Sequence, residues 1–153
     1  MVRATATGSP RLPVGRVVAA SYAAGISLVG YNLGVRRQTS RDVLQRWRDE
    51  AEPRSYPAAT TAVFAVGAND TAEEDGVLRV EASDSVQALA VLLQQAEEAG
   101  LPAMAVGPAP VGDRSQTERI VALSGRFARA LHSARGAVCE RGGGALPKRD
   151  VED

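Results

Sequence analysis

The two residue types that most often build metal and redox sites are scarce in this sequence. It contains one cysteine, Cys139, and one histidine, His132. A lone cysteine excludes a disulfide within the chain and a cysteine-only zinc site, and one histidine beside it argues against a mixed His/Cys metal cluster. We therefore expect no metal and no cofactor. Cys139 has no activating neighbour except scattered arginines, so a reactive thiol is not expected.

An excess of one charge and a long apolar run are also missing. Eighteen Lys and Arg residues balance eighteen Asp and Glu residues, so no global charge favours nucleic acid or an anionic membrane. No apolar segment approaches the roughly 20 residues of a membrane span, and residues 1–15 lack the apolar centre of a signal peptide. These absences predict a cytoplasmic protein with neither a nucleic-acid nor a membrane partner.

The order of the predicted segments indicates one α/β domain. A chain of 153 residues that is 44% hydrophobic suits a single core. Helical patterns alternate with β-branched runs, as in βαβ units with a mostly parallel sheet. The predicted helices span 15–25, 39–53, 84–99 and 115–136, and the predicted strands span 26–34, 61–66 and 101–108, with 136–139 as a candidate fourth strand. Residues 139–153, rich in glycine and charge, are predicted to be disordered.

Polar or small residues follow each of the three predicted strands. The segments are "YNLG" (31–34), "VGANDT" (66–71) and "VGPAPVGD" (106–113). Because the carboxyl ends of parallel strands meet at one edge of a sheet, the Gly34 N–H and the Asn69 amide are expected to converge. Two neutral hydrogen-bond donors that point at the same position would form an oxyanion hole.

These residues also suit purely structural roles. Asn69 and Asp70 have the chemistry of a turn cap, and Gly34 that of an ordinary turn glycine. The basic cluster of Arg36, Arg37 and Arg41 suits either an anionic substrate or a solvated helix start. The acidic stretch 73–76 lacks the alternating spacing of a calcium loop and is expected to be solvated.

The segments "YNLGVRRQTSRDVLQRW", "FAVGANDT" and "AGLPAMAVGPAPVGDRSQTERIVALSGRFA" occur in an order that resembles the SGNH hydrolases, the GDSL-like lipase and esterase family. The likeness runs from Ser9 to Ala130. It implies a three-layer α/β/α sandwich with a flavodoxin-like parallel sheet over residues 9–138. It also implies cleavage of a small-molecule ester through an acyl-enzyme, with Gly34 and Asn69 as the oxyanion hole.

Other parts of that family's pattern are missing from this chain. The family begins with a strand ending in G-D-S, whose serine attacks the ester, and it ends with an Asp-x-x-His pair. Here Ser9 lies in a Pro-flanked loop and Ser21 in a predicted helix, so neither is expected to be the nucleophile. His132 is expected to be a solvated helix histidine, and Asp150 has no partner histidine.

We therefore expect a sheet that lacks its first strand and a domain that is incomplete at both ends, from a fragment or a mis-started gene product. The missing strand would leave a gap inside the sheet, and the backbone N–H and C=O groups of the two strands beside the gap would be unpaired. Two functions follow. One is an SGNH-type esterase that is inactive as written, and the other is a non-catalytic α/β binding module derived from a hydrolase. A flavodoxin-like nucleotide or flavin binder is disfavoured because no glycine-rich phosphate loop opens any helix.

Overall fold

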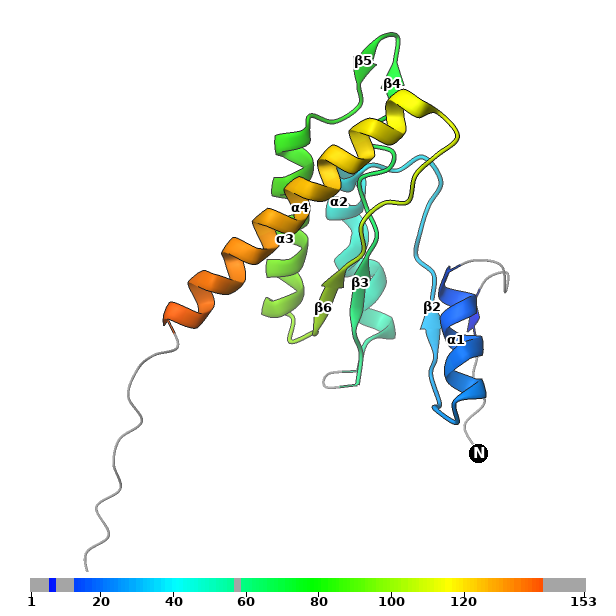
Figure 1. The fold of residues 1–153 in the computed structure, drawn as a ribbon. Helices are drawn as coiled ribbons and strands as arrows, with labels where there is room; N and C mark the ends of the chain where they lie inside the picture. The colour runs from blue at the N-terminus through cyan, green and yellow to red at the C-terminus, as the bar shows by residue number, and fades with distance from the viewer. Residues whose placement is uncertain (1–5, 8–12, 57–58, 142–153) are drawn as a thin grey trace, which may run out of the picture. The chain divides into compact units, whose positions relative to one another are not determined.

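A computed structural model describes the backbone of residues 6–7, 13–56 and 59–141, and the side chains of 13–56 and 59–132 (Figure 1). The chain divides into two compact units, an N-terminal unit, Met1–Arg36, and a C-terminal unit, Arg37–Asp153.

The N-terminal unit is a small βαβ arrangement. Strand β1 (Ala6–Thr7) pairs in parallel with β2 (Gly30–Tyr31), and helix α1 (Pro13–Ala23) comes between them in the chain. A Cβ atom on Gly30 would lie 2.7 Å from Val14 Cγ1, so glycine allows the helix to approach the strand. Gly25, at φ 74°, ends the helix as predicted.

Strand β1 corrects the expectation that no strand precedes the first helix. With two residues, it is too short to show the alternation by which strands are found in a sequence. Ser9 therefore follows a strand and precedes a helix in chain order, although Ser9 itself lies outside the described residues.

The C-terminal unit contains a second parallel pair and three long helices. Strand β3 (Ala62–Phe64) pairs with β6 (Ala103–Ala105), with Val63 opposite Met104. The helices are α2 (Ser40–Ala51), followed by a 3-10 turn (Glu52–Arg54), α3 (Ala82–Glu98) and α4 (Arg114–Arg141). These elements confirm a mixed α/β protein, in which the strands are shorter than their apolar runs because few residues pair with a neighbouring strand.

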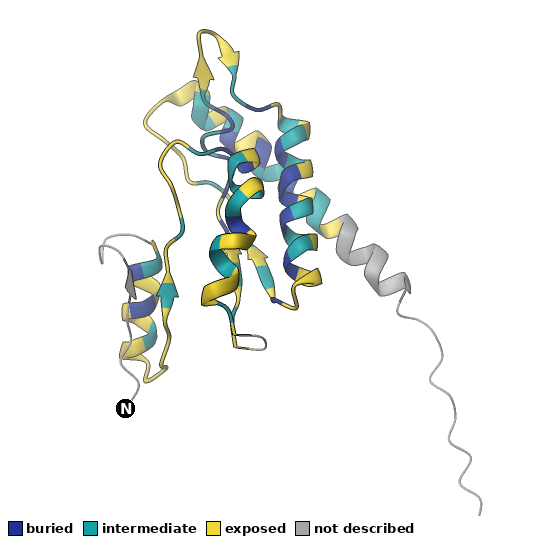
Figure 2. Cartoon of the chain, turned by 180° about the vertical axis from the view of Figure 1, so that it is seen from behind, coloured by how far each residue is buried: buried dark blue, intermediate teal, exposed yellow. Residues whose placement is uncertain are grey.

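The core of the C-terminal unit forms where α2, α3 and α4 present the apolar faces that their spacing predicts (Figure 2). Trp47 contacts Phe64 edge to face at a centroid distance of 5.3 Å, and its indole Nε1–H donates to Gln95 Oε1 at 2.8 Å. The indole therefore buries its ring without losing a hydrogen bond. The buried members are Trp47, Phe64, Val66, Leu89, Leu92, Ala96, Leu101, Leu123 and Phe127.

Helix α2 begins with a capping box. The side chain of Thr39, the N-cap, accepts from Asp42 N at 3.4 Å, and Thr39 N donates to Asp42 Oδ2 at 2.8 Å. Of the two predicted caps, Thr39 and Ser40, the structure selects Thr39. The backbone N–H of Thr39, and after it the Thr39 hydroxyl, which donates to Asp42 Oδ2 at 2.7 Å, hold the pKa of Asp42 below its ordinary value.

Two segments differ from their predicted structures. The acidic stretch after β3 forms an antiparallel hairpin of β4 (Glu73–Glu74) and β5 (Val77–Leu78), with Asp75 and Gly76 at φ 54° and 75°. Asp-Gly favours such a turn because both residues tolerate positive φ. The candidate strand at 136–139 is instead helical and belongs to α4, continuing a helix that begins at Arg114.

Candidate functional site

The site predicted after β3 is a five-residue turn, 67–71, which we call the GAND turn. It begins at buried Gly67, whose φ is 108°. A Cβ atom there would lie 3.1 Å from both Leu123 Cδ2 and Phe127 Cε2. Backbone conformation and space therefore both require glycine where the strand ends. The turn thus begins against the inner face of α4.

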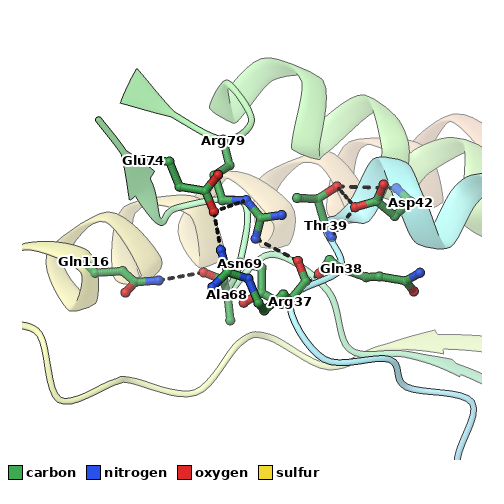
Figure 3. Close-up of polar contacts among 9 residues, drawn as sticks. All are labelled: Arg37, Gln38, Thr39, Asp42, Ala68, Asn69, Glu74, Arg79 and Gln116. Atoms are coloured by element: carbon green, nitrogen blue, oxygen red, sulfur yellow. Dashed lines mark hydrogen bonds and ion pairs between the residues drawn. The ribbon is translucent and has the colours of Figure 1, made fainter. Parts of the chain in front are cut away.

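Asn69 is half-buried and is oriented by the segment before α2. Its side-chain Nδ2 donates to the carbonyl oxygen of Gln38 at 2.8 Å (Figure 3). This bond uses one of the two amide hydrogens, and the other is the donor that an oxyanion hole would employ. A side chain held in this way keeps its direction, which is what a preorganised donor requires.

Asp70 is fully buried and does more than cap its own turn. Its Oδ1 accepts from the backbone N–H of Ser40, the first residue of α2, at 2.8 Å. The positive end of the α2 dipole favours a carboxylate at this place. Within the described part of the chain, Asp70 Oδ2 and the hydroxyl oxygens of Ser40 and Ser85 are buried without a hydrogen-bond partner.

Helix α4 holds the GAND turn from another side. Gln116 Nε2 donates to Ala68 O at 2.8 Å, and Arg119 Nε donates to Thr71 O at 2.9 Å. Thr71 Oγ1 also donates to Ala68 O at 2.8 Å. The turn is thus bonded to both α2 and α4, so its backbone position depends on two helices far apart in the sequence.

Ion pairs with arginines stabilise the β4–β5 hairpin, which follows this turn in the chain. Glu74 pairs with Arg37 at 2.6 Å and with Arg79 at 3.4 Å, and Arg79 Nη1 also donates to Arg37 O at 2.7 Å. Arg119 pairs with Glu73 at 3.1 Å. Glu73 and Glu74 are thus paired with arginines of this chain, whereas the stretch was expected to be only solvated.

The basic cluster predicted from the sequence is partly accounted for by the same kind of contact. Arg37 pairs with Glu74, and Arg41 pairs with Asp84 of α3. Both arginine side chains remain more than half exposed, at 78% and 57%. Their nearest charged partners are carboxylates of this chain, which favours the helix-start interpretation over an anionic substrate.

Gly34, the second predicted oxyanion donor, belongs to the N-terminal unit. Its N–H donates to Asn32 Oδ1 at 3.0 Å in an Asx turn. Since Gly34 and Asn69 lie in different units, their convergence stays a prediction. For the Gly34 N–H to reach a ligand, the Asn32 side chain has to release it.

The remaining chemically active residues occupy ordinary positions. Ser21 Oγ donates to Val18 O at 2.9 Å inside α1, and His132 is an exposed residue of α4, as expected. The described residues contain no cluster of His, Cys, Asp and Glu suited to a metal ion. Nor does any helix in the described ranges have the length and apolarity to span a membrane.

Sequence reasoning missed Gln116 and Arg119, which no local pattern distinguishes from surface residues. The hairpin, in contrast, had a signal in its Asp-Gly pair. Comparisons of the chain with protein-family models and with curated proteins give no match.

Proposed function

We propose that this chain carries part of the ester-binding site of an SGNH-type serine hydrolase, with Asn69 and Gly34 as oxyanion donors. The fixed amide of Asn69 is the observation that carries the proposal. Its Nδ2 is oriented by Gln38 O, and the neighbouring Asp70 is bound to the first turn of α2. A half-buried amide after a strand, oriented by a backbone carbonyl, suits a tetrahedral oxygen better than a solvated turn does.

The finer fold belongs to the same proposal. Two parallel β-strand pairs, each with a helix between its strands in the chain, are the units from which a doubly wound sheet is built. Val63 and Met104 are paired in register and are 55% and 52% exposed. A three-layer α/β/α sandwich would cover such an apolar face.

The proposed chemistry requires a nucleophile that the described residues do not supply. In acyl transfer a serine oxygen attacks the ester carbonyl, and the carbonyl oxygen gains the negative charge that Asn69 and Gly34 would stabilise. Ser21 is bonded within its helix, and His132 is exposed on α4. Ser9 follows β1 in chain order but lies outside the described residues. Because the single histidine of the sequence is the exposed His132, a serine would lack its general base, and we expect the 153-residue chain to hydrolyse no ester.

The test is hydrolysis of p-nitrophenyl acetate by the chain and by a protein extended upstream in frame. We expect turnover only in the extended protein, and Asn69→Asp should lower it about 10²- to 10³-fold because an acceptor replaces a donor. Gln38→Ala is the matched control, since it leaves the carbonyl that Asn69 bonds. An extended protein that is folded and inert would sink the esterase proposal.

Hydrolysis by the short chain would contradict a different part of the proposal. If Ser9→Ala then abolishes the activity, the nucleophile is present and our account of its absence is wrong. If Ser9→Ala and Asn69→Asp both leave the activity unchanged, the hydrolysis does not arise at this site.

A non-catalytic binding module is the second candidate. It is favoured by the bond that already occupies the second expected donor, since the Gly34 N–H donates to Asn32 Oδ1 within the chain. If the chain is such a module, we expect the chain and the protein extended upstream both to fold. Neither should hydrolyse p-nitrophenyl acetate, and both should bind a carboxylate such as acetate. Asn69→Asp should abolish that binding, because a second carboxylate would repel the ligand.

A further inference from the structure

The two segments that meet at the Asn69 side chain are joined a second time by Arg79 (Figure 3). Asn69 Nδ2 donates to Gln38 O at 2.8 Å, and Arg79 Nη1 donates to the preceding carbonyl, Arg37 O, at 2.7 Å. The backbone N–H of Arg79 donates to Ala72 O at 3.0 Å, directly after the GAND turn. Arg79 therefore connects the GAND turn with the segment before α2, beside the bond that orients Asn69.

We propose that Arg79 is a positioning residue for Asn69. By bonding to Arg37 O, it holds the segment before α2 in the conformation in which Gln38 O orients the Asn69 amide. The inference rests on the proposed function for the ligand that this amide would bind, whereas the orientation of the amide is a property of the chain itself.

The backbone conformation of Arg37 explains why its carbonyl has to be held. Its φ is 65°, in the left-handed region that residues with a Cβ atom rarely adopt. Such a conformation persists only where the surrounding structure imposes it. Because the backbone dihedral angles of Arg37 set the path of the chain into Gln38, a return to a commoner conformation would turn Gln38 O away from Asn69.

The contact from Arg79 is better shielded from water than the ion pair of the Arg37 side chain. Arg37 and Glu74 are 78% and 53% exposed, and an ion pair so exposed contributes little. The Arg79 side chain is 19% exposed, and its Nε lies 3.4 Å from the same Glu74 carboxylate. A charged donor that is shielded from water binds a carbonyl more strongly. We therefore expect Arg79 to hold Arg37 in its unusual conformation.

The other end of the segment is held by helix α2. Gln38 Oε1 accepts from Arg46 Nε at 2.6 Å, and Thr39 N donates to Asp42 Oδ2 at 2.8 Å. These two bonds do not involve Arg79. A change at Arg79 therefore releases one end of the segment and leaves the helical end in place.

Hydrogen exchange of the Asn69 side-chain amide, measured by NMR in the 153-residue chain, tests the proposal. Arg79→Met removes the guanidinium donors and keeps an apolar stem for packing. We expect the exchange rate of the Asn69 side-chain hydrogens to rise about two- to tenfold, the range that corresponds to the loss of one hydrogen bond. This measurement requires no substrate and no activity.

Two controls separate this effect from a general loosening of the fold. The indole N–H of Trp47, which donates to Gln95 Oε1 at 2.8 Å, is an internal reference whose exchange should stay unchanged. Arg114→Met is the matched variant, because Arg114 also pairs with a glutamate, Glu118, but is 93% exposed on α4. It should leave both exchange rates at their parental values.

A double variant tests the part played by the Arg37 backbone. Glycine adopts a φ of 65° without the steric penalty of a Cβ atom. Adding Arg37→Gly to Arg79→Met should therefore return Asn69 exchange toward the parental rate. If Arg79 only added one more contact, removing a second arginine would raise the exchange further, and that result would overturn the proposal.

Circular dichroism and thermal melting establish that each variant is folded. Should Arg79→Met unfold the chain, Arg79→Lys decides the question, since one ammonium group cannot reproduce the contacts with both Arg37 O and Glu74. It should raise Asn69 exchange by a smaller factor and leave Trp47 unchanged. Equal Asn69 exchange in the variant and the parent would overturn the proposal, and so would an equal rise at Trp47.

Kinetics of the protein extended upstream distinguish this inference from the proposed function. If the extended protein hydrolyses p-nitrophenyl acetate, Arg79→Met should lower kcat and change KM little, because an oxyanion donor acts in the transition state. An unaltered kcat in a variant whose Asn69 exchange has risen would overturn the positioning role. An inert extended protein would contradict the proposed function alone, since the exchange rates still decide what orients Asn69.

Discussion

The carboxylate of Asp70 accepts a hydrogen bond from the backbone N–H of Ser40, thirty residues earlier in the chain, at 2.8 Å. This bond joins the GAND turn to the first turn of α2, and both residues are fully buried. The neighbouring residue, Asn69, bonds to Gln38 in the same segment. The orientation of the proposed oxyanion donor is therefore tied to the N-terminus of α2.

We expect Asp70→Ala to lower the free energy of unfolding by about 1–3 kcal/mol, because it leaves the buried Ser40 N–H without an acceptor. Asp70→Asn should cost less, since its amide oxygen still accepts that bond. Urea unfolding of both variants measures the difference. Asp49→Ala, at an exposed position of α2, is the control. Equal effects from Asp70→Ala and Asp49→Ala would show that the bond contributes nothing.

Gly67→Ala should also destabilise the protein, by about 1–3 kcal/mol. The residue has a φ of 108°, and the added Cβ would lie 3.1 Å from Leu123 Cδ2 and Phe127 Cε2. Gly112→Ala serves as the control, because a Cβ there meets nothing within 4 Å. Thermal melting distinguishes the two variants, and a Gly67→Ala protein as stable as the parent would contradict the requirement for glycine.

The capping box of α2 predicts a pH dependence. Hydrogen bonds from Thr39 hold the pKa of Asp42 below its ordinary value in the folded chain, whereas the unfolded chain has the usual value of about 3.9. Asp42 therefore stabilises the fold at pH values above the unfolded pKa. This contribution is lost as the pH falls through the lower folded pKa.

Denaturant unfolding of the parent and of Asp42→Asn across this pH range measures the loss. The stability gap between the two proteins should be widest near neutral pH and should narrow in acid. Thr39→Ala should cost about 1 kcal/mol at neutral pH through loss of the N-cap. A gap that is constant with pH would mean that the Asp42 charge contributes nothing to the cap.

The contacts of Arg119 predict that this side chain protects the β4–β5 hairpin from local opening. Its Nε donates to Thr71 O, and its Nη1 pairs with Glu73, so one planar guanidinium contacts both sides of the turn into β4. Lysine cannot reproduce that pair of contacts. Arg119→Lys should raise amide hydrogen exchange in residues 73–78 several-fold, to be measured by mass spectrometry. Arg129→Lys, at an exposed position, should leave exchange unchanged, and equal rates in both variants would contradict the role.

Local patterns predicted the helices better than the strands. Apolar spacing located α2, α3 and α4 to within a few residues, because a helix makes its hydrogen bonds within one segment. The strands were predicted too long, since a strand exists only where another strand pairs with it. The candidate strand at 136–139 was wrong for the same reason: these residues are helical, and within the described ranges no strand pairs with them.

The candidate site, too, was predicted only in part from the sequence. The residue types of Gly67, Asn69 and Asp70 marked the end of β3 as a polar turn. Neither spacing nor composition showed that Asp70 would be buried against α2 or that Gln116 would bond to Ala68. These contacts join residues that are thirty and forty-eight positions apart, and they form only when the helices pack.

The sequence by itself determined where α2 and α3 begin and end, to within a few residues, and that a glycine and two polar residues close β3. Capping, turn formation and helical amphipathicity depend on neighbours a few positions apart. Tertiary structure alone decided which carbonyl orients Asn69 and which backbone N–H receives Asp70. Those bonds depend on the packing of whole helices around the core, and that packing is a property of the folded chain.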